Sequence, residues 1–216
     1  MDRREALQTI GGGALLASIA PFTFLSNTAE ANTDMALSIA PPPRATSLSL
    51  PNVILRNQDN QKVRLYDDLI KDKVFIINMF FIGCTDGKCP VVTANLARVQ
   101  KLIGDRLGRD VFMYSISLAP KHDTPKALKK YAAHFGVKPG WSFLTGDAND
   151  IERLRRKLGF WSPDPVRDAK KTTHTGLVMM GNDRLDRWMG TPALAKPTAI
   201  MRNFSYVDEP QNQNFS

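Results

Sequence analysis

The chain has 216 residues, of which 43% are hydrophobic and 23% are charged, a composition that suits one globular domain with extensions. Two cysteines in a chain of this length exclude a disulfide-rich miniature. The formal net charge of +8 favours anionic partners, either a lipid face or an acidic protein. Lysine and arginine are spread over several predicted helices without a basic-aromatic stripe, so no nucleic-acid partner is expected.

The N-terminus has the anatomy of an export signal. Arg3 and Arg4 precede a weakly hydrophobic run from Ile10 to Leu25, and Ala29-Glu30-Ala31 is an A-x-A cleavage pattern. The arginine pair resembles a twin-arginine signal, although Ala6 stands where an aromatic residue is usual. Cleavage is favoured over an uncleaved anchor, because the run of 16 residues is short for a span of about 20. We therefore expect a periplasmic, extracytoplasmic protein whose mature chain carries +9, with membrane anchoring as the alternative.

The chain divides into four predicted segments. The export signal is 1–31, a proline-containing linker is 32–47, a folded domain is 48–203 and a tail is 204–216. The domain should open with a hairpin formed by Val53–Arg56 and Lys62–Leu65.

The core of the domain is predicted from a β-α-β pattern. Lys73–Phe80 lacks alternation and is rich in Val, Ile and Phe, as a strand covered on both faces would be. Pro90–Leu107 has apolar residues at helical spacing, and Val111–Leu118 is the next strand. The crossover between the two strands should be right-handed.

The rest of the domain adds a further β-α unit and ends in a hairpin. The predicted elements are a helix from Thr124-Pro125 to Phe135, a strand Trp141–Thr145, a helix from Asp147 to Leu158, a loop Phe160–Lys171, strands Thr175–Met180 and Leu185–Met189, and a helix from Thr191-Pro192. Together these patterns predict an α/β, thioredoxin-like fold: a central mixed β-sheet with helices on both faces and an N-terminal hairpin extension.

Both cysteines, Cys84 and Cys89, lie in the short loop between the first core strand and the first helix. Pro90 suits the first turn of a helix, which makes Cys89 the predicted N-cap. The positive end of the helix and Lys88 should then favour thiolate, although Asp86 opposes it. We accordingly expect the cysteine pair to titrate below the ~8.5 of a free thiol.

The cysteine pair could form a structural disulfide, or it could carry out redox or metal chemistry. A disulfide that closes a loop of four intervening residues would stabilise the fold by only roughly 2 kcal/mol. A chain of this length can bury a core without such a cross-link. Redox or metal chemistry is therefore the favoured role.

A histidine is the candidate third group. His122 and His134 are expected to be surface residues, whereas His174 stands immediately before a predicted strand. Thioredoxin-like topology would bring that loop opposite the cysteine loop. Two thiolates and one imidazole form a soft ligand set that suits copper, while structural zinc would usually need a fourth ligand.

These motifs resemble the SCO/SenC family of copper-binding, thioredoxin-like assembly proteins, from about Leu48 to Gly190. The resemblance rests on Cys89-Pro90, on Ser115-Ile116-Ser117-Leu118 before Asp123-Thr124-Pro125, on the segment Trp141–Gly146, and on His174 before a strand and hairpin. It implies that Cys84, Cys89 and His174 are copper ligands. It also implies a role in building the binuclear copper centre of respiratory cytochrome oxidase.

Three positions depart from the family pattern. Four residues separate Cys84 from Cys89, where the family usually has three. Ala119 and Thr173 stand where the family usually has acidic residues. The change at Thr173 would remove a carboxylate that could orient the imidazole.

Two functions remain in competition. As a copper metallochaperone, the protein would hold Cu(I) or Cu(II) through Cys84, Cys89 and His174 and pass it to an acceptor such as the copper-site subunit of a respiratory oxidase. As an extracytoplasmic thiol-disulfide oxidoreductase, it would use the two cysteines as catalytic groups on protein disulfides, and His174 would be dispensable. A thioredoxin-like reductant would then be a further partner. The cysteine spacing departs from the two-residue redox motif and favours the first function.

Overall fold

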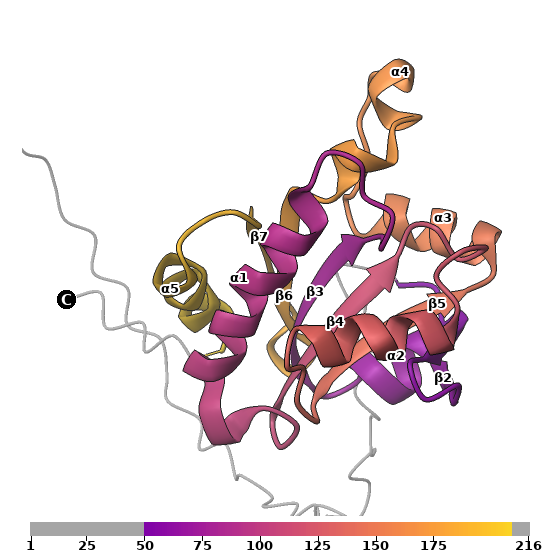
Figure 1. Ribbon diagram of the computed structural model, residues 1–216. Coiled ribbons are helices and arrows are strands. Elements are labelled where there is room, and N and C mark those ends of the chain that lie inside the picture. The colour runs from indigo at the N-terminus through magenta and orange to yellow at the C-terminus, as the bar shows by residue number, and fades with distance from the viewer. Residues whose placement is uncertain (1–49, 209–216) are drawn as a thin grey trace, which may run out of the picture. The chain divides into compact units, whose positions relative to one another are not determined.

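The computed structural model describes residues 50–208, which are built on a seven-stranded mixed sheet (Figure 1). The sheet order is β2-β1-β5-β4-β3-β6-β7. The strands are β1 (Ile54–Asn57), β2 (Lys62–Arg64), β3 (Val74–Phe80), β4 (Val111–Ser117), β5 (Trp141–Gly146), β6 (Leu177–Asn182) and β7 (Arg187–Pro192). The helices are α1 (Lys88–Ile103), α2 (Pro125–His134), α3 (Ala148–Lys157), α4 (Pro165–Asp168) and α5 (Pro197–Asp208).

Strand β3 lies in the interior of the sheet, between β4 and β6. All seven of its residues are buried, as its unbroken apolar sequence predicts. It pairs in parallel with β4, from Val74 opposite Val111 to Phe80 opposite Ser117, and antiparallel with β6 on its other side. The β-α-β pattern of the sequence is therefore confirmed, and the carboxyl ends of β3 and β4 lie together at one edge.

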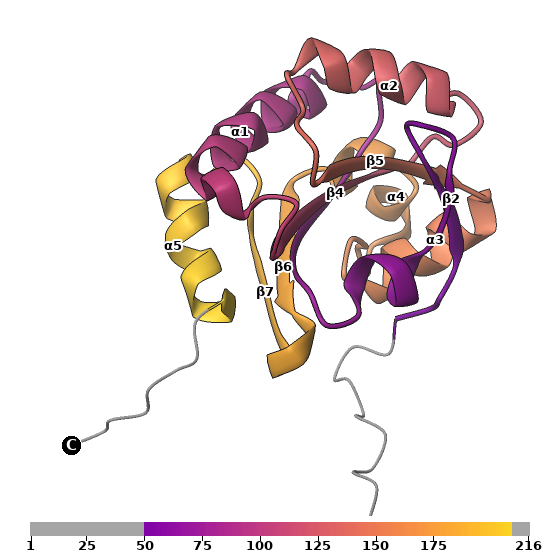
Figure 2. The same ribbon diagram turned by 90° about the horizontal axis from the view of Figure 1, so that it is seen from below.

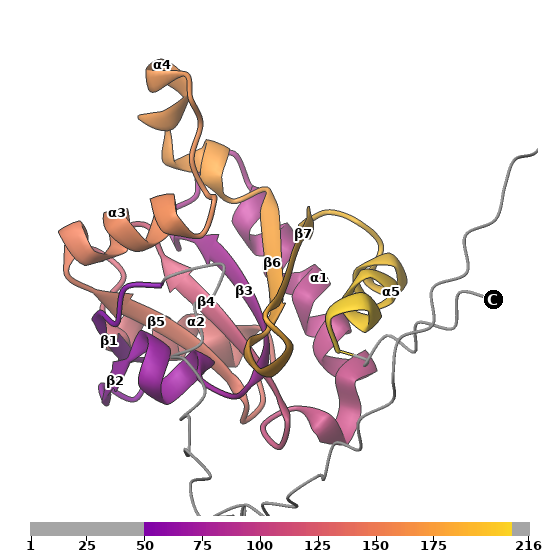
Figure 3. The same ribbon diagram turned by 180° about the vertical axis from the view of Figure 1, so that it is seen from behind.

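Helices cover both faces of the sheet. Figure 2 shows α1 and α2 over one face and α3 on the other, and Figure 3 shows α5 beside α1. The side chain of Asn95 on α1 donates hydrogen bonds to the carbonyls of Ala193 and Ala195, which join this helix to the segment before α5. The predicted thioredoxin-like α/β fold is confirmed.

The N-terminal hairpin is part of the main sheet. Strands β1 and β2 pair with each other, and β1 also pairs antiparallel with β5. Leu55 of β1 is completely buried. The hairpin therefore extends the sheet at one edge, as the sequence predicts.

The C-terminal part differs in its boundaries from the sequence expectation. Thr191 and Pro192 end strand β7 instead of opening a helix, and α5 begins at Pro197. The helix continues to Asp208, beyond the predicted start of the tail, because Phe204 and Val207 are buried. The predicted leader 1–31 and linker 32–47 lie outside the described residues. Within residues 50–208, no helix combines the length and apolar character needed to cross a membrane.

One close backbone contact makes a glycine obligatory. Gly140, just before β5, has φ +95°, and a Cβ built on it would lie 2.3 Å from the backbone nitrogen of Gly108. The three nearest atoms all belong to the backbone of Leu107 and Gly108, so no flexible side chain can move aside. Gly136, by contrast, has φ +63° but open space around the corresponding position.

The substitution Gly140→Ala should therefore destabilise the fold far more than Gly136→Ala. Both introduce backbone strain of about 1–3 kcal/mol, and Gly140→Ala adds an overpacking cost of about the same size. Urea denaturation of the two variants beside the wild type measures the difference. Equal losses of unfolding free energy would show that the approach of Gly108 and Gly140 does not constrain the fold.

Candidate functional site

The cysteine loop connects the end of β3 to the start of α1, at the carboxyl edge of the central strands. Open α/β sheets commonly place their sites at this edge. The loop is fixed to its neighbour by the buried carboxylate of Asp123, which accepts hydrogen bonds from the Ile82 amide (3.2 Å) and the Ser117 hydroxyl (2.5 Å). Burial raises the pKa of Asp123, and these hydrogen bonds oppose that rise. Sequence reasoning assigned Asp123 no role, although it directly precedes the Thr124 N-cap of α2.

The fold brings the two sulfurs together. Cys84 is half-buried, Cys89 is completely buried, and both are free thiols. The backbone N–H of Cys89 donates to the sulfur of Cys84, with an N···S distance of 3.4 Å. Solvent therefore reaches the Cys84 sulfur but not the adjacent Cys89 sulfur.

The start of α1 differs from the sequence expectation. The helix begins at Lys88, and its N-cap is Gly87 in the left-handed region at φ +69°, without a side-chain cap. Cys89 lies inside the first turn and is not the N-cap. Its amide, one of the donors exposed at a helix start, points instead to Cys84. The sequence predicts that the start of the helix acts on Cys89. In the structure it acts on Cys84 instead.

Asp86 determines the polar surroundings of Cys84. Its carboxylate accepts the thiol hydrogen of Cys84 (2.9 Å) and the backbone N–H of Lys88 (3.2 Å). The ammonium group of Lys88 pairs with the same carboxylate at 3.0 Å. The hydrogen bond from Cys84 and the contacts with Lys88 lower the pKa of Asp86. Lys88 is thus paired with Asp86, whereas the sequence expectation assigned its charge to a thiolate.

The predicted lowering of the cysteine pKa is wrong for Cys89. Burial, followed by the hydrogen bond with Cys84, raises the pKa of the Cys89 thiol to about 12. The Phe81 backbone and the Thr175 side chain also hydrogen-bond to this sulfur and act in the opposite direction, but their effect is smaller. A thiolate at Cys89 therefore needs a compensating cation, because water does not reach it.

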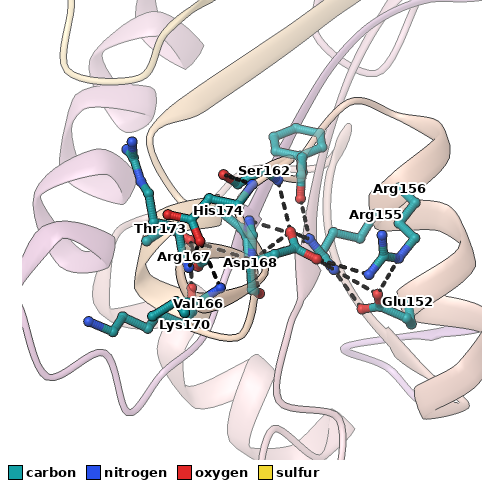
Figure 4. A network of polar contacts seen from close by, with 12 residues as sticks. Glu152, Arg155, Arg156, Ser162, Val166, Arg167, Asp168, Lys170, Thr173 and His174 are labelled. Atoms are coloured by element: carbon teal, nitrogen blue, oxygen red, sulfur yellow. Dashed lines mark hydrogen bonds and ion pairs between the residues drawn. The ribbon is translucent and has the colours of Figure 1, made fainter.

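His174 lies at the end of a short 3-10 turn, Lys171–His174, and is buried (Figure 4). Its Nε2 atom is 2.8 Å from the backbone carbonyl oxygen of Asp168. Because a carbonyl only accepts, Nε2 carries a hydrogen in this arrangement. One terminal nitrogen of the Arg155 guanidinium lies 3.2 Å from Nε2 and 3.4 Å from Nδ1.

Arg155 is the centre of this network (Figure 4). It projects from α3, is 4% exposed, and makes a two-pronged ion pair with Asp168 at 2.7 and 2.9 Å. It also donates to both carboxylate oxygens of Glu152 and to the carbonyl of Phe160. The guanidinium holds the pKa of Asp168 well below its usual range. Sequence reasoning took the basic residues of this helix for a solvated face and so missed Arg155 and Asp168.

The structure does not gather the three predicted ligands into one cluster. Within the described part of the chain, no three His, Cys, Asp or Glu side chains form a group that could hold a metal ion. The two sulfurs adjoin each other, while the His174 imidazole is held by Asp168 and Arg155. The next residue, Thr175, nevertheless contacts the Cys89 sulfur through its side chain. The histidine segment therefore reaches the site even though the imidazole is turned away.

A cavity of about 600 Å³ adjoins the histidine network. It is bounded by the end of β4 and by α3, and its lining includes His122, Arg155, Asp168 and His174. His122 itself is exposed, as is His134, whose ring packs edge-on against Phe135. Both therefore are the surface residues that the sequence predicts.

A free thiol pair at the carboxyl edge of a thioredoxin-like sheet defines this chain as a member of the thioredoxin-like thiol proteins. A sequence model of the SCO1/SenC family matches residues 53–204. That match extends over most of the chain, and it shows that the protein belongs to the SCO1/SenC family.

Individual proteins are similar to parts of the chain. A SCO1 protein homolog of Bacillus subtilis is 35% identical over 104 residues, which cover 47% of this chain and 52% of the homolog. The chain thus spans about half the length of this curated relative. Yeast Sco1, solved with copper bound, is 17% identical with a TM-score of 0.57, over 76% of this chain and 98% of that one.

A second solved structure is BsSco, described as a member of the Sco family of cytochrome c oxidase assembly proteins in which a disulfide switch was identified. It is 24% identical with a TM-score of 0.58, over 72% of this chain and 91% of that one. At these identities, the two solved structures show the shared fold.

The unequal burial of the two sulfurs predicts unequal reactivity. A pKa of about 12 leaves about one Cys89 thiol in 10⁴ ionised at pH 8. Iodoacetamide should therefore modify Cys84 at least about tenfold faster than Cys89. Peptide mass spectrometry after timed quenching measures both rates, with the guanidinium-denatured protein as the control in which they converge. Equal rates in the folded protein would contradict the burial of Cys89.

Proposed function

We propose that the protein is a copper metallochaperone that carries copper as cargo between Cys84, Cys89 and His174. The observation that carries this proposal is the pair of adjacent free thiols, with the Thr175 side chain against the Cys89 sulfur. Thr175 directly follows His174, so the imidazole belongs to the chain segment that reaches the Cys89 sulfur. Thiolate and imidazole ligands together suit copper.

Copper supplies the positive charge that the buried Cys89 sulfur needs in order to ionise. Burial keeps the Cys89 proton in place in the metal-free protein, so binding has to release it. Copper affinity should therefore rise with pH, because at higher pH the displaced proton is less able to compete for the sulfur. The half-buried Cys84 leaves one side of the site open to an acceptor.

The histidine turn has to rearrange for the third ligand to bind. The imidazole leaves the Asp168 carbonyl and the Arg155 guanidinium, whose positive charge opposes a metal ion at the same place. Exposed Gly176 has open space around its Cα and offers a pivot next to Thr175. The free energy of breaking this network reduces the apparent affinity for copper.

The acceptor that we propose is the copper-site subunit of a respiratory oxidase. Support comes from the family assignment and from the description of BsSco as belonging to cytochrome c oxidase assembly proteins. Transfer would proceed by stepwise exchange of ligands, beginning at the accessible Cys84. Arg3, Arg4 and Ala29-Glu30-Ala31 support an export leader, so we propose that transfer takes place outside the cytoplasm, with the protein either free in the periplasm or anchored to the membrane.

A thiol-disulfide oxidoreductase is the second candidate function, and the unequal exposure of the sulfurs favours it. Cys84 is accessible and could attack a partner disulfide as thiolate, releasing one partner thiolate and forming a mixed disulfide. Cys89, adjacent and buried, could then attack Cys84, which releases the partner as a dithiol and leaves a Cys84–Cys89 disulfide. A thioredoxin-like reductant would restore the pair. His174 has no part in this sequence of steps.

The substitution His174→Ala separates the two functions. Titration of the reduced protein with Cu(I) and Cu(II) against a competing chelator should show at least about tenfold weaker binding for this variant. The rate of disulfide exchange should stay nearly unchanged. His134→Ala, at an exposed position on α2, is the matched control. Equal copper binding by wild type and His174→Ala would remove the histidine from the site.

The substitution Asp168→Asn tests whether the network opposes copper binding. Loss of the carboxylate charge weakens the pair with Arg155 and frees the loop that holds His174, so copper should bind several-fold more tightly. The matched control is Asp164→Asn on the same loop, where the aspartate caps α4. Copper affinity that is unchanged or weaker in Asp168→Asn would show that the network does not restrain the ligand.

A further inference from the structure

The segment that carries α4 projects from the body of the molecule (Figures 1 and 3). It presents two large apolar side chains to solvent: Trp161 is 49% exposed and Val166 is 68% exposed. Neither residue contributes to the cysteine site. A convex projection with an exposed indole is a feature that the copper function leaves unexplained.

Cations surround these apolar side chains. Trp161 lies beside the last turns of α3, where it lines a shallow hollow with Arg153, Arg156 and Lys157. Between positions 150 and 171 there are seven arginine and lysine residues and four carboxylates, a net charge of +3. Arg155 is buried in the network, and the remaining six cations are exposed: Arg153, Arg156, Lys157, Arg167, Lys170 and Lys171.

The projection is held in one conformation before any partner arrives. Asp164 caps α4 by accepting the N–H of Val166 at 2.9 Å. Asp168 accepts the N–H of Ser162 at 2.8 Å and is fixed by the ion pair with Arg155. Docking through Trp161 and Val166 would therefore require little further ordering of the loop.

We propose that the docking loop, defined as residues 161–171 together with the exposed end of α3, binds the surface of a bilayer that contains anionic lipids. Tryptophan places its ring at the level of the headgroups, and lysine and arginine around it attract lipid phosphates. Insertion of Val166 adds apolar burial at the acyl boundary. This inference does not rest on copper binding.

The shape and charge of the loop favour a bilayer over an acidic protein. A stable protein interface needs about 800 Å² from each partner, with complementary shape. A projection whose helix has four residues offers a small convex surface, which suits partitioning into a deformable lipid layer. The net charge of +3 is attracted to an anionic headgroup region, where no acidic groups have to match the positions of individual cations.

The test follows the fluorescence of Trp161 in the reduced full-length chain. Of the other two tryptophans, Trp141 is buried and Trp188 is half-buried. With vesicles of about 30% phosphatidylglycerol in phosphatidylcholine, the emission should shift to the blue, and brominated acyl chains should quench it. About 0.5 M NaCl should reverse both effects, since screening weakens headgroup attraction. The Trp161→Phe variant, which reports the two other tryptophans, should show neither effect.

A charge variant completes the test. Lys157→Ala combined with Arg167→Ala and Lys170→Ala should weaken the quenching at least about tenfold in lipid concentration. The matched control removes three lysines from α2 on the other face of the sheet, Lys126, Lys129 and Lys130, and should leave the quenching unchanged.

Three outcomes would overturn the proposal. The first is cosedimentation with vesicles without quenching of Trp161, which would assign binding to another part of the chain. The second is an equal loss of quenching in both triple variants, which would show that vesicle binding depends on the net charge of the protein and not on the docking loop. The third is a spectral shift with poly-glutamate but not with vesicles, which would make an acidic polypeptide the partner.

Discussion

A guanidinium group that is almost completely removed from water determines the arrangement of the loop between α3 and β6. Arg155 pairs with Asp168 and Glu152 and donates to the carbonyl of Phe160. A buried cation of this kind is stable only while its partners remain in place, since an unpaired buried charge is costly. The same contacts therefore fix the projecting segment that bears α4 and the position of His174. One ion pair therefore supports both the projecting segment and the position of the histidine.

The cysteine loop is held by a different set of contacts. The start of the loop is held by a hydrogen bond from the Ile82 amide to the buried carboxylate of Asp123. The loop ends at Gly87, the N-cap of α1. This arrangement exposes Cys84 to partners and removes Cys89 from water. A sulfur in such a position favours a proton or a soft cation over a bare negative charge. In the proposed copper site, metal binding and proton release would therefore be coupled.

Much of this architecture could be predicted from local sequence. The apolar run at β3 is buried on both faces, and Thr124 and Asp147 cap their helices as expected, because these signals act over a few residues. The proximity of the two sulfurs follows from their spacing. The raised pKa of Cys89 could not be predicted in this way, because its main cause is the burial of the sulfur in the folded domain. The restraint on His174 depends on a backbone carbonyl 6 positions away and a side chain 19 positions away, which no local pattern joins.

In the proposed copper site, the imidazole leaves its network and joins the two sulfurs around copper. X-ray absorption spectroscopy at the copper edge of the Cu(I)-loaded protein tests it directly, because sulfur and nitrogen scatterers have distinct distances and amplitudes. We expect two sulfur ligands and one imidazole nitrogen in the wild type, and loss of the imidazole signal in His174→Ala with both sulfurs retained. A spectrum with two sulfurs alone, identical in the wild type and the variant, would contradict it.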